Sequence, residues 1–277
     1  MTRILAFSGK KQSGKSTHTN FIHGYQLKSF HVIQNYALTK EGNLLVETNG
    51  SSDQEPVYSK LDISRTDDEF ADWASYHMWP FVKKYSFAHP LKSIAVELFG
   101  IRPEQVNGSD FDKNTKTHLR WEDMPILKSG KRTSQKKGRM TAREFLQFFG
   151  TEICRHMYED IWSESLIRAI NSESPLIAVI DDVRFENEIK AVQDAGGKVV
   201  RLTRKSSKDN HKSETELDSY KGFDCVIDNT KMSINETNQE IIKALKSWNW
   251  LGEELQPRPQ KPNEERQLVG GIHQIKG

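Results

Sequence analysis

The strongest constraint on the fold of this chain is the octapeptide GKKQSGKS at residues 9–16. It matches the pattern G-x-x-x-x-G-K-[ST], follows an apolar run at 4–7 and precedes a segment that can begin a helix. The two glycines allow a tight turn in which consecutive N–H groups point at phosphate oxygens, at the positive end of that helix. Lys15 would reach the β- and γ-phosphates, and the Ser16 hydroxyl would bind Mg²⁺. The octapeptide therefore predicts a P-loop for a nucleoside triphosphate with Mg²⁺ rather than a chance glycine-rich turn.

Composition narrows the class of protein. A chain of 277 residues can bury a substantial core, as one large domain or two small ones. The formal net charge of +2 does not favour a general nucleic-acid or membrane binder. Cys154 and Cys225 lack metal-ligand spacing, so we expect reduced, buried side chains. Because no signal peptide precedes the first strand and no apolar run is long enough for a membrane span, we expect a cytoplasmic protein.

Apolar runs that alternate with helical patterns define the expected fold class. Such alternation is typical of an α/β protein with a parallel sheet, right-handed crossovers and helices on both faces. Ligands of such sheets bind at the carboxyl ends of the strands. We predict a three-layer P-loop kinase fold with five parallel strands at 4–8, 85–88, 176–181, 198–202 and 224–227.

Residues 29–80 interrupt this alternation and are interpreted as an insertion into a connection that needs only a few residues. Within it, 35–38 and 44–47 flank a polar turn at 40–43, which predicts a β-hairpin. A helix is expected near 67–81. Three roles are open for the insertion: it covers a substrate site, it mediates contacts between subunits, or it does neither.

Two further segments differ from the rest in composition. The loop KSGKRTSQKKGR at 128–139 is basic but lacks interleaved aromatic residues. We interpret it as a solvated or polyphosphate-attracting loop rather than a nucleic-acid site. The tail at 252–277 is polar and rich in Pro and Gly, and we expect it to be poorly ordered. Residues 1–251 are therefore predicted to form a single domain that contains the insertion.

The segment MTAREFLQFFGTEICRHMYEDIW at 140–162 is the most informative one after the P-loop. Thr141 and Glu144 have the spacing of a capping box, which predicts a helix start. At about 100° per residue, one face would present Arg143, Gln147, Thr151, Arg155 and, if the helix continues that far, Trp162. The opposite face, directed to the core, would hold Phe145, Leu146, Phe149, Ile153 and Met157. Arginines suited to phosphate and a tryptophan that can stack on a base favour a nucleotide site over a plain solvated face.

A pair of acids ends the apolar run at 176–180. Asp181 and Asp182 would lie at the carboxyl end of a buried strand. There an acid can orient a Mg²⁺-bound water or accept a hydrogen bond from a sugar hydroxyl, while Arg184 can hold a phosphate. The competing interpretation is that one of these acids caps the following helix.

Several blocks of sequence carry a family resemblance in the same order. They are FSGKKQSGKST at 7–17, FAHPLKSIAVELFG at 87–100, DKNTKTHLRWEDMP at 112–125, MTAREFLQFFGTEICR at 140–155, DDVRFENE at 181–188, and RLTR, HKSETELD and FDCVIDN between 201 and 229. Together they cover nearly the whole chain except the insertion and the tail. The chain resembles the deoxynucleoside monophosphate kinases of tailed bacteriophages, a branch of the P-loop nucleoside monophosphate kinases. The resemblance implies transfer of the ATP γ-phosphoryl group to a deoxynucleoside monophosphate (dNMP), giving a diphosphate (dNDP) and ADP, with Mg²⁺, in support of phage DNA synthesis in the host cytoplasm.

The resemblance also implies roles for individual residues. It places ATP on Gly9, Ser13, Gly14, Lys15, Ser16 and Thr17. It places the dNMP on Lys11, Leu91, Lys92, Arg143, Gly150, Thr151, Trp162, Asp182 and Arg184, to which the helical face adds Arg155. Catalytic roles would fall on Lys15, Lys11, Arg143 and Arg184. Ser16 and Asp182 are the candidate metal ligands, and the division of Asp182 between acceptor and metal stays open.

Arg204 opens a polar loop, 204–213, where this fold usually carries a mobile lid. A lid arginine would be a further catalytic residue that stabilises the transferring charge after closure. The alternative is an exposed arginine at the end of a strand.

Two other functions are weighed against the nucleotide kinase. A P-loop kinase of a small non-nucleotide metabolite would keep the P-loop and arginines but have no use for a stacking Trp162. A nucleic-acid-associated ATPase would use the basic loop and show steep salt dependence. We expect a dNMP substrate, no membrane and no stable nucleic-acid binding, and a homodimer is left open.

Overall fold

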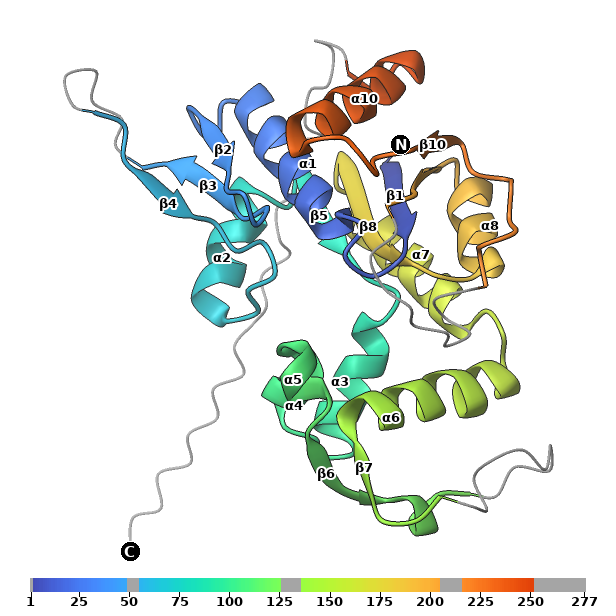
Figure 1. Cartoon of the computed structure of the whole chain (residues 1–277). Helices are drawn as coiled ribbons and strands as arrows, with labels where there is room; N and C mark the ends of the chain where they lie inside the picture. The colour runs from blue at the N-terminus through green and yellow to red at the C-terminus, as the bar shows by residue number, and fades with distance from the viewer. Residues whose placement is uncertain (1, 49–54, 126–135, 205–215, 252–277) are drawn as a thin grey trace, which may run out of the picture.

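A five-stranded parallel sheet forms the centre of the molecule (Figure 1). The computed structural model describes residues 2–48, 55–125, 136–204 and 216–251. The sheet has the order β10-β9-β1-β8-β5, and every neighbouring pair is parallel. Its strands are β1 (Arg3–Gly9), β5 (Val82–Tyr85), β8 (Ile177–Val183), β9 (Lys198–Leu202) and β10 (Cys225–Ile227). The predicted fold class is confirmed.

The second strand of the five-stranded sheet in chain order, β5, lies three residues earlier than predicted. Residues 86–88, assigned to a strand from the sequence, form the turn into α3 (His89–Glu97), which has Pro90 in its first turn. Strand β5 instead contains Lys83 and Lys84 between the buried residues Val82 and Tyr85. The two lysines interrupt the apolar pattern from which strands were predicted. They are tolerated there because β5 is an edge strand whose middle residues are only partly buried.

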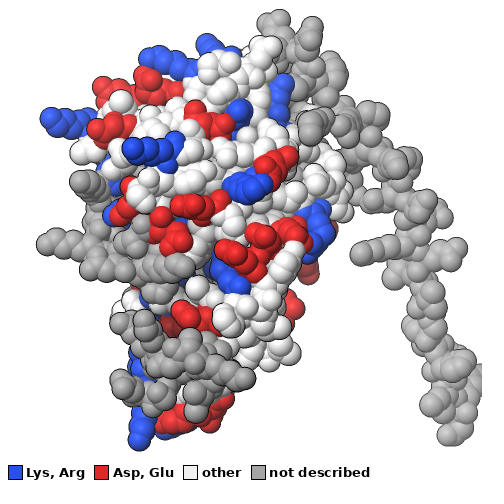
Figure 2. Space-filling model, turned by 90° about the vertical axis from the view of Figure 1, so that its right-hand side faces the viewer, with Lys and Arg blue, Asp and Glu red and all other residues white. Residues whose placement is uncertain are grey.

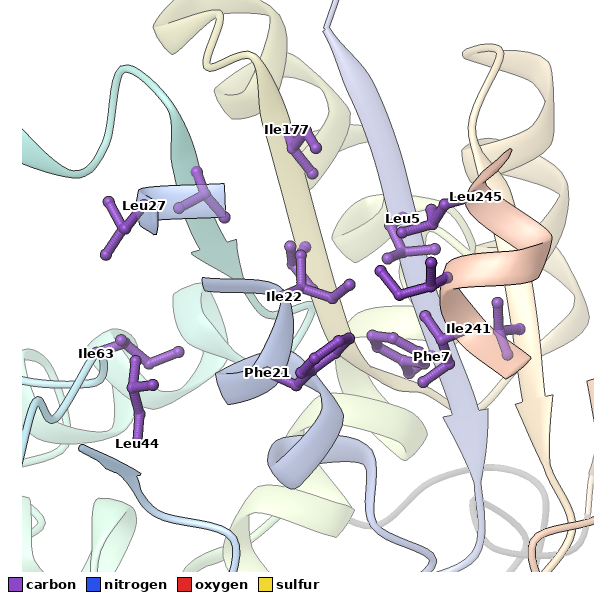
Figure 3. Packing of buried hydrophobic residues seen from close by; sticks show 14 of the residues in the cluster. Leu5, Phe7, Phe21, Ile22, Leu27, Leu44, Ile63, Ile177, Ile241 and Leu245 are labelled. Carbon is purple, nitrogen blue, oxygen red and sulfur yellow. The ribbon is translucent and has the colours of Figure 1, made fainter. Parts of the chain in front are cut away.

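Helices cover both faces of the sheet. On one face, α1 (Lys15–Ser29) and α10 (Ile234–Ser247) pack against strand residues such as Leu5, Phe7 and Val179. Figure 3 shows this packing, with Phe21 and Ile241 directed at β1 from the two helices. On the other face, α7 (Ile161–Glu173) and α8 (Glu186–Asp194) pack against Ile4, Ala6 and Ile180. Alternate residues of one strand therefore serve two separate cores.

The insertion at 29–80 packs on α1. The predicted hairpin is confirmed as the antiparallel pair β2 (Tyr36–Leu38) and β3 (Leu44–Glu47), and a third strand that we did not predict, β4 (Tyr58–Lys60), pairs with β3. Helix α2 (Asp68–His77) begins at the predicted place, where the Asp67 side chain accepts a hydrogen bond from Phe70 N, but ends four residues earlier than expected. Leu44 is fully buried in the same core as α1.

Glycines allow the close contact between the insertion and α1. A Cβ on Gly24 of α1 would lie 2.4 Å from the Tyr36 ring, and a Cβ on Gly42 would lie 2.1 Å from Thr17 Oγ1. The Asn20 side chain donates to the Gly42 carbonyl oxygen at 2.8 Å. The insertion is thus a layer over the helix that follows the P-loop.

A second body of structure projects from the carboxyl edge of the sheet, below it in Figure 1. We call the described residues of 89–155 the projecting lobe. It contains α3, α4 (Pro103–Asn107), α5 (Asp110–Lys113), β6 (Lys116–Arg120), η1 (Trp121–Asp123), β7 (Arg139–Thr141), α6 (Ala142–Gln147) and the π-helix η2 (Phe148–Arg155). Its own hydrophobic core includes Ile101, Trp121, Met140 and Phe145.

Several predictions fall outside the described residues. They concern the tail at 252–277, most of the basic loop at 128–139 and the lid-like loop beyond Arg204. Cys154 is free and buried, as predicted, whereas Cys225 is free and only partly buried. Among the described residues, every helix is too short or too polar to cross a membrane. On the face seen in Figure 2, basic and acidic side chains are interspersed.

Candidate active site

The P-loop joins β1 to α1 and depends on both of its glycines. Gly14, the residue before α1, has φ of +100°, a conformation that disfavours residues with a Cβ. A Cβ on Gly9 would lie 2.4 Å from Ser13 Oγ and 2.8 Å from the Leu202 carbonyl oxygen. The Lys15 ammonium donates to the carbonyl oxygens of Gly9 at 2.6 Å and Lys10 at 2.9 Å. The strand, loop and helix order predicted from the octapeptide is therefore present.

Asn229, which we did not predict as a site residue, stabilises the P-loop through side-chain hydrogen bonds. Its buried side chain donates from Nδ2 to the Ser13 carbonyl oxygen at 2.9 Å and accepts at Oδ1 from Arg204 N at 2.9 Å. The neighbouring His18 of α1 pairs with Asn238 at 2.7 Å and is also buried. These contacts tie the P-loop to the segments that follow β9 and β10.

The acid beside the P-loop is Asp181. Its Oδ2 accepts a hydrogen bond from Ser16 Oγ at 3.1 Å and pairs with Lys84 Nζ at 3.0 Å. A hydroxyl and a carboxylate oxygen match the hard oxygen ligands that Mg²⁺ prefers, and Mg²⁺ usually needs only one or two protein ligands besides phosphate oxygens and waters. Within the described ranges, no cluster of three His, Cys, Asp or Glu side chains could hold a metal ion. Ser16 and Asp181 therefore fit a metal that is shared with a bound polyphosphate.

Asp182, which we predicted as a metal ligand with Ser16, has a different environment. Its carboxylate accepts from Ser86 Oγ at 2.6 Å, Phe87 N at 3.0 Å and Ala88 N at 3.1 Å. It thus fixes the turn between β5 and α3. Successive residues of a strand point to opposite faces, so Asp181 and Asp182 cannot both face Ser16.

The prediction that one of these acids caps the next helix was wrong. Helix α8 is capped by Glu188, whose Oε2 accepts from Arg184 N at 2.7 Å and Phe185 N at 3.2 Å. Phe185 stands at the N-cap position, where a capping box normally has Ser or Thr, so the sequence pattern does not mark Glu188 as the capping residue.

A pocket of about 150 Å³ lies where the projecting lobe meets the carboxyl edge of the sheet. We call it the Trp162 pocket. It brings together predicted acceptor residues from four separate segments, namely Leu91, Gly150, Thr151, Arg155, Trp162, Asp182 and Arg184. It is also lined by residues that we did not assign to the acceptor, namely Phe87, Ala88, Leu146, Gln147, Phe185 and Glu188.

The helix that supplies much of this pocket is not a continuous α-helix. The predicted capping box is present, since Thr141 Oγ1 accepts from Glu144 N at 3.1 Å and Glu144 Oε2 accepts from Thr141 N at 2.9 Å. After α6, however, the chain widens into the π-helix η2, in which hydrogen bonds join residues five apart. Leu146, expected in the core, packs against the core of the lobe and also lines the pocket.

The end of the predicted helix also differs. Met157, predicted to be buried, is the last helical residue before the break that precedes α7, and it is 81% exposed. Trp162 is buried, and its Nε1 donates to the Gly150 carbonyl oxygen at 3.1 Å. A Cβ on Gly150 would lie 2.6 Å from Leu91 Cδ2. Glycine at this position lets η2 approach α3 closely.

A buried ion pair forms the floor of the Trp162 pocket. Arg155 pairs with Glu188, donates to Asn187 Oδ1 at 3.2 Å and lies 4.0 Å from the centre of the Phe185 ring. Glu188 is only 2% exposed. Burial raises the pKa of Glu188 to about 7, although Arg155 opposes the shift.

The remaining predicted cations occupy three places. Lys11 and Arg143 both contact Asp110, between the P-loop and the projecting lobe. Lys92 of α3 is partly buried, and burial lowers its pKa while Asp182 raises it. Arg204 donates from its guanidinium to the carbonyl oxygens of Asn229, at 3.0 and 3.1 Å, and Met232, at 2.7 Å. It is therefore anchored to the loop after β10, and is not the exposed strand-end residue of the alternative interpretation.

Comparison with known proteins shows the family of the chain. A family model described as deoxynucleotide monophosphate kinase matches residues 105–241. A protein of Acanthamoeba polyphaga mimivirus, named "Putative deoxynucleotide monophosphate kinase", is 31% identical over 179 residues. This match covers 60% of the present chain and 83% of the viral protein. The chain belongs to the deoxynucleotide monophosphate kinase family.

The family assignment confirms the resemblance seen in the sequence blocks, except for the phage origin, which stays a prediction. The matched residues of this kinase include α5, α6, η2, α7 and β8, and with them Arg143, Trp162 and both acids. The P-loop sequence at 9–16 lies outside the matched range of the family model.

Proposed function

We propose that this kinase transfers the γ-phosphoryl group of ATP to the 5′-phosphate of a dNMP and releases ADP and the dNDP. The observation that carries the proposal is the position of the Trp162 pocket beside the P-loop. The pocket takes part of its wall from the residues that follow β5 and β8, and the P-loop follows β1, the other neighbour of β8 in the same parallel sheet. ATP at the P-loop and a dNMP in the Trp162 pocket would present their phosphates to each other.

ATP is proposed to bind at the P-loop. Its phosphates would be held by the backbone of Gly9, Ser13 and Gly14 and by the Lys15 ammonium. Thr17, at the start of α1, would also contact ATP. Ser16 and Asp181 would hold Mg²⁺, which neutralises phosphate charge when bound. In the structure Lys15 contacts two P-loop carbonyl oxygens, so ATP binding would exchange these acceptors for phosphate oxygens.

The acceptor base is proposed to bind in the Trp162 pocket. Phe87, Leu91 and the Trp162 ring would provide apolar contact, and Thr151 and Arg155 polar contact, which is the mixture typical of small-ligand sites. Arg184, with Lys11 and Arg143, would bind the acceptor phosphate. This division leaves Asp182 as a structural acceptor for the turn before α3 rather than a metal ligand.

Catalysis would consist mainly of positioning and charge neutralisation. Phosphoryl transfer needs the attacking and leaving oxygens in line, cations around the transferring group and exclusion of water. Lys15, Arg143 and Arg184 would supply positive charge, and the projecting lobe would shield the site from one side. We propose no transfer role for Arg204, since its guanidinium donates to backbone carbonyl oxygens.

A coupled assay of ADP release tests the proposal. ATP and Mg²⁺ are supplied with each of dAMP, dCMP, dGMP, dTMP, 5-hydroxymethyl-dCMP and the ribonucleotides, and Lys15→Ala serves as the control. We expect turnover with one or more deoxynucleotides that the control abolishes. Folded, ATP-binding protein that is inactive across the whole panel would refute the proposed reaction.

A further inference from the structure

One carboxylate joins the P-loop to the projecting lobe. Asp110, the first residue of α5, accepts a hydrogen bond at Oδ1 from Arg143 Nη2 at 2.6 Å. Through Oδ2 it forms an ion pair with Lys11 Nζ. Arg143 also donates from Nε to Asn114 Oδ1 at 3.1 Å. Two cations from distant segments, both proposed to bind the acceptor phosphate, therefore meet on a single acidic side chain.

Several cations lie around Asp110. Lys113, at the other end of α5, is partly buried. Burial and the charges of Lys92, Arg143 and Lys11 lower the pKa of Lys113, and the charge of Asp110 raises it. The pKa of Asp110 is itself held below its usual value, first by Lys11 and then by Arg143. A phosphate dianion would balance these cations better than one carboxylate does.

The contacts of Asp110 are accessible to a solute. The side chains of Asp110, Lys11 and Arg143 are 50%, 37% and 31% exposed. Ion pairs at such positions contribute little net free energy, because water screens them and long side chains must be ordered. An incoming anion can therefore displace the carboxylate without disrupting the fold of the lobe.

We propose that Asp110 is the internal counter-ion of the acceptor-phosphate site. It holds Lys11 and Arg143 together while no dNMP is bound, and the 5′-phosphate replaces it on the same two cations. The link between P-loop and lobe then runs through the substrate. Asp110 is thus a positioning residue that competes with the substrate: it raises the KM for the dNMP and leaves kcat unchanged. This inference rests on the proposed binding of a dNMP at Lys11 and Arg143.

The chain offers a matched control on the other side of the P-loop. Asp218 pairs with Lys10 at 2.7 Å and with Arg201 at 3.4 Å, and its side chain is 42% exposed. Asp218→Asn removes the same charge from a neighbouring P-loop lysine. It leaves the contacts of Lys11 and Arg143 with Asp110 intact.

Calorimetric titration with inorganic phosphate tests the proposal without requiring turnover. Wild type, Asp110→Asn and Asp218→Asn are compared with the P-loop saturated by ADP and Mg²⁺. We expect Asp110→Asn to bind phosphate about three- to tenfold more tightly than wild type. Asp218→Asn should bind as wild type does. Asp110→Ser serves as a second variant, and melting temperatures verify folding.

Steady-state kinetics give the second readout. The KM for the accepted dNMP should fall in Asp110→Asn by the same factor as the phosphate dissociation constant, with kcat unchanged. Weaker or unchanged phosphate binding, or an equal gain in Asp218→Asn, would overturn the counter-ion role. A gain in phosphate affinity specific to Asp110→Asn, in a protein that turns over no deoxynucleotide, would support the counter-ion role and refute the proposed reaction.

Discussion

The P-loop and the Trp162 pocket lie at the same edge of the sheet but are built in different ways. The P-loop is one run of consecutive residues between β1 and α1, and its proposed phosphate contacts use backbone N–H groups that every residue in the run supplies. The pocket draws on α3, η2, α7 and the exit of β8, which meet only in the folded chain. A phosphate can be held by a short motif, whereas a base needs apolar walls and directed polar groups from several segments.

Because the P-loop and the Trp162 pocket are built from different segments, we expect a substitution in one site to leave binding at the other unchanged. Lys15→Met should have the largest effect on activity. It removes a cation from the transferring phosphates while keeping most of the side-chain volume. We expect kcat to fall by about 10²- to 10³-fold or more, with the KM for the dNMP nearly unchanged. Steady-state kinetics with both substrates varied measure this. A large rise in the KM for the dNMP would show that the two sites are not independent.

The neighbouring acids Asp181 and Asp182 provide a sharper comparison within one strand. Asp181→Asn should raise the Mg²⁺ concentration needed for half-maximal activity by about 10- to 100-fold, because it weakens a proposed metal ligand. Asp182→Asn should leave the Mg²⁺ requirement unchanged and reduce stability by about 1 kcal/mol, because it weakens hydrogen bonds to Ser86, Phe87 and Ala88.

Magnesium titrations of activity and chemical denaturation of both variants check this pair of expectations. The original assignment of the metal to Asp182 would be restored if the Mg²⁺ requirement moved in Asp182→Asn and not in Asp181→Asn.

Trp162→Phe tests the pocket alone. It keeps an aromatic ring but removes the hydrogen bond from Nε1 to the Gly150 carbonyl oxygen. A buried hydrogen bond contributes about 1 kcal/mol, so we expect the KM for the dNMP to rise about fivefold while the KM for ATP stays constant. Equal changes in both KM values would show that Trp162 supports the fold as a whole rather than the pocket.

Lowering the pH should change the contributions of His23 and Glu188 to the free energy of unfolding in opposite directions. Burial lowers the pKa of His23, in α1, from 6.5 to about 4. Between these values the unfolded chain binds a proton that the folded chain does not, so this contribution to stability falls as the pH drops from about 6.5 to 4. Burial raises the pKa of Glu188 from 4.5 to about 7. Here the folded chain binds the extra proton, so the contribution rises as the pH drops from about 7 to 4.5.

Melting temperatures between pH 4 and 8 measure these small effects, of the order of a few degrees. As the pH falls, wild type should lose stability relative to His23→Asn and gain stability relative to Glu188→Gln. Parallel pH profiles for wild type and a variant would show that the substituted residue does not titrate differently in the folded and unfolded chains.

Features that depend on local sequence were predictable. The P-loop and the capping box at Thr141 arise from residues close together in the chain, and the strands β1, β8, β9 and β10 from continuous apolar runs. The hairpin of the insertion follows from its polar turn in the same way. Features that depend on packing were missed. The π-helix η2 has no signature in the sequence, and β5 contains two lysines that interrupt its apolar pattern.

The sequence by itself determined the strands β1, β8, β9 and β10, the P-loop motif and the family resemblance, because continuous runs of residues carry these signals. Only the tertiary structure decided which acid faces Ser16 and which carboxylate lies between Lys11 and Arg143. Strand β8 is buried on both faces, so its apolar pattern does not reveal which face packs on α1. Asp181 follows Ile177 and Val179 on the face toward α1, and that orientation is set by packing across the whole sheet.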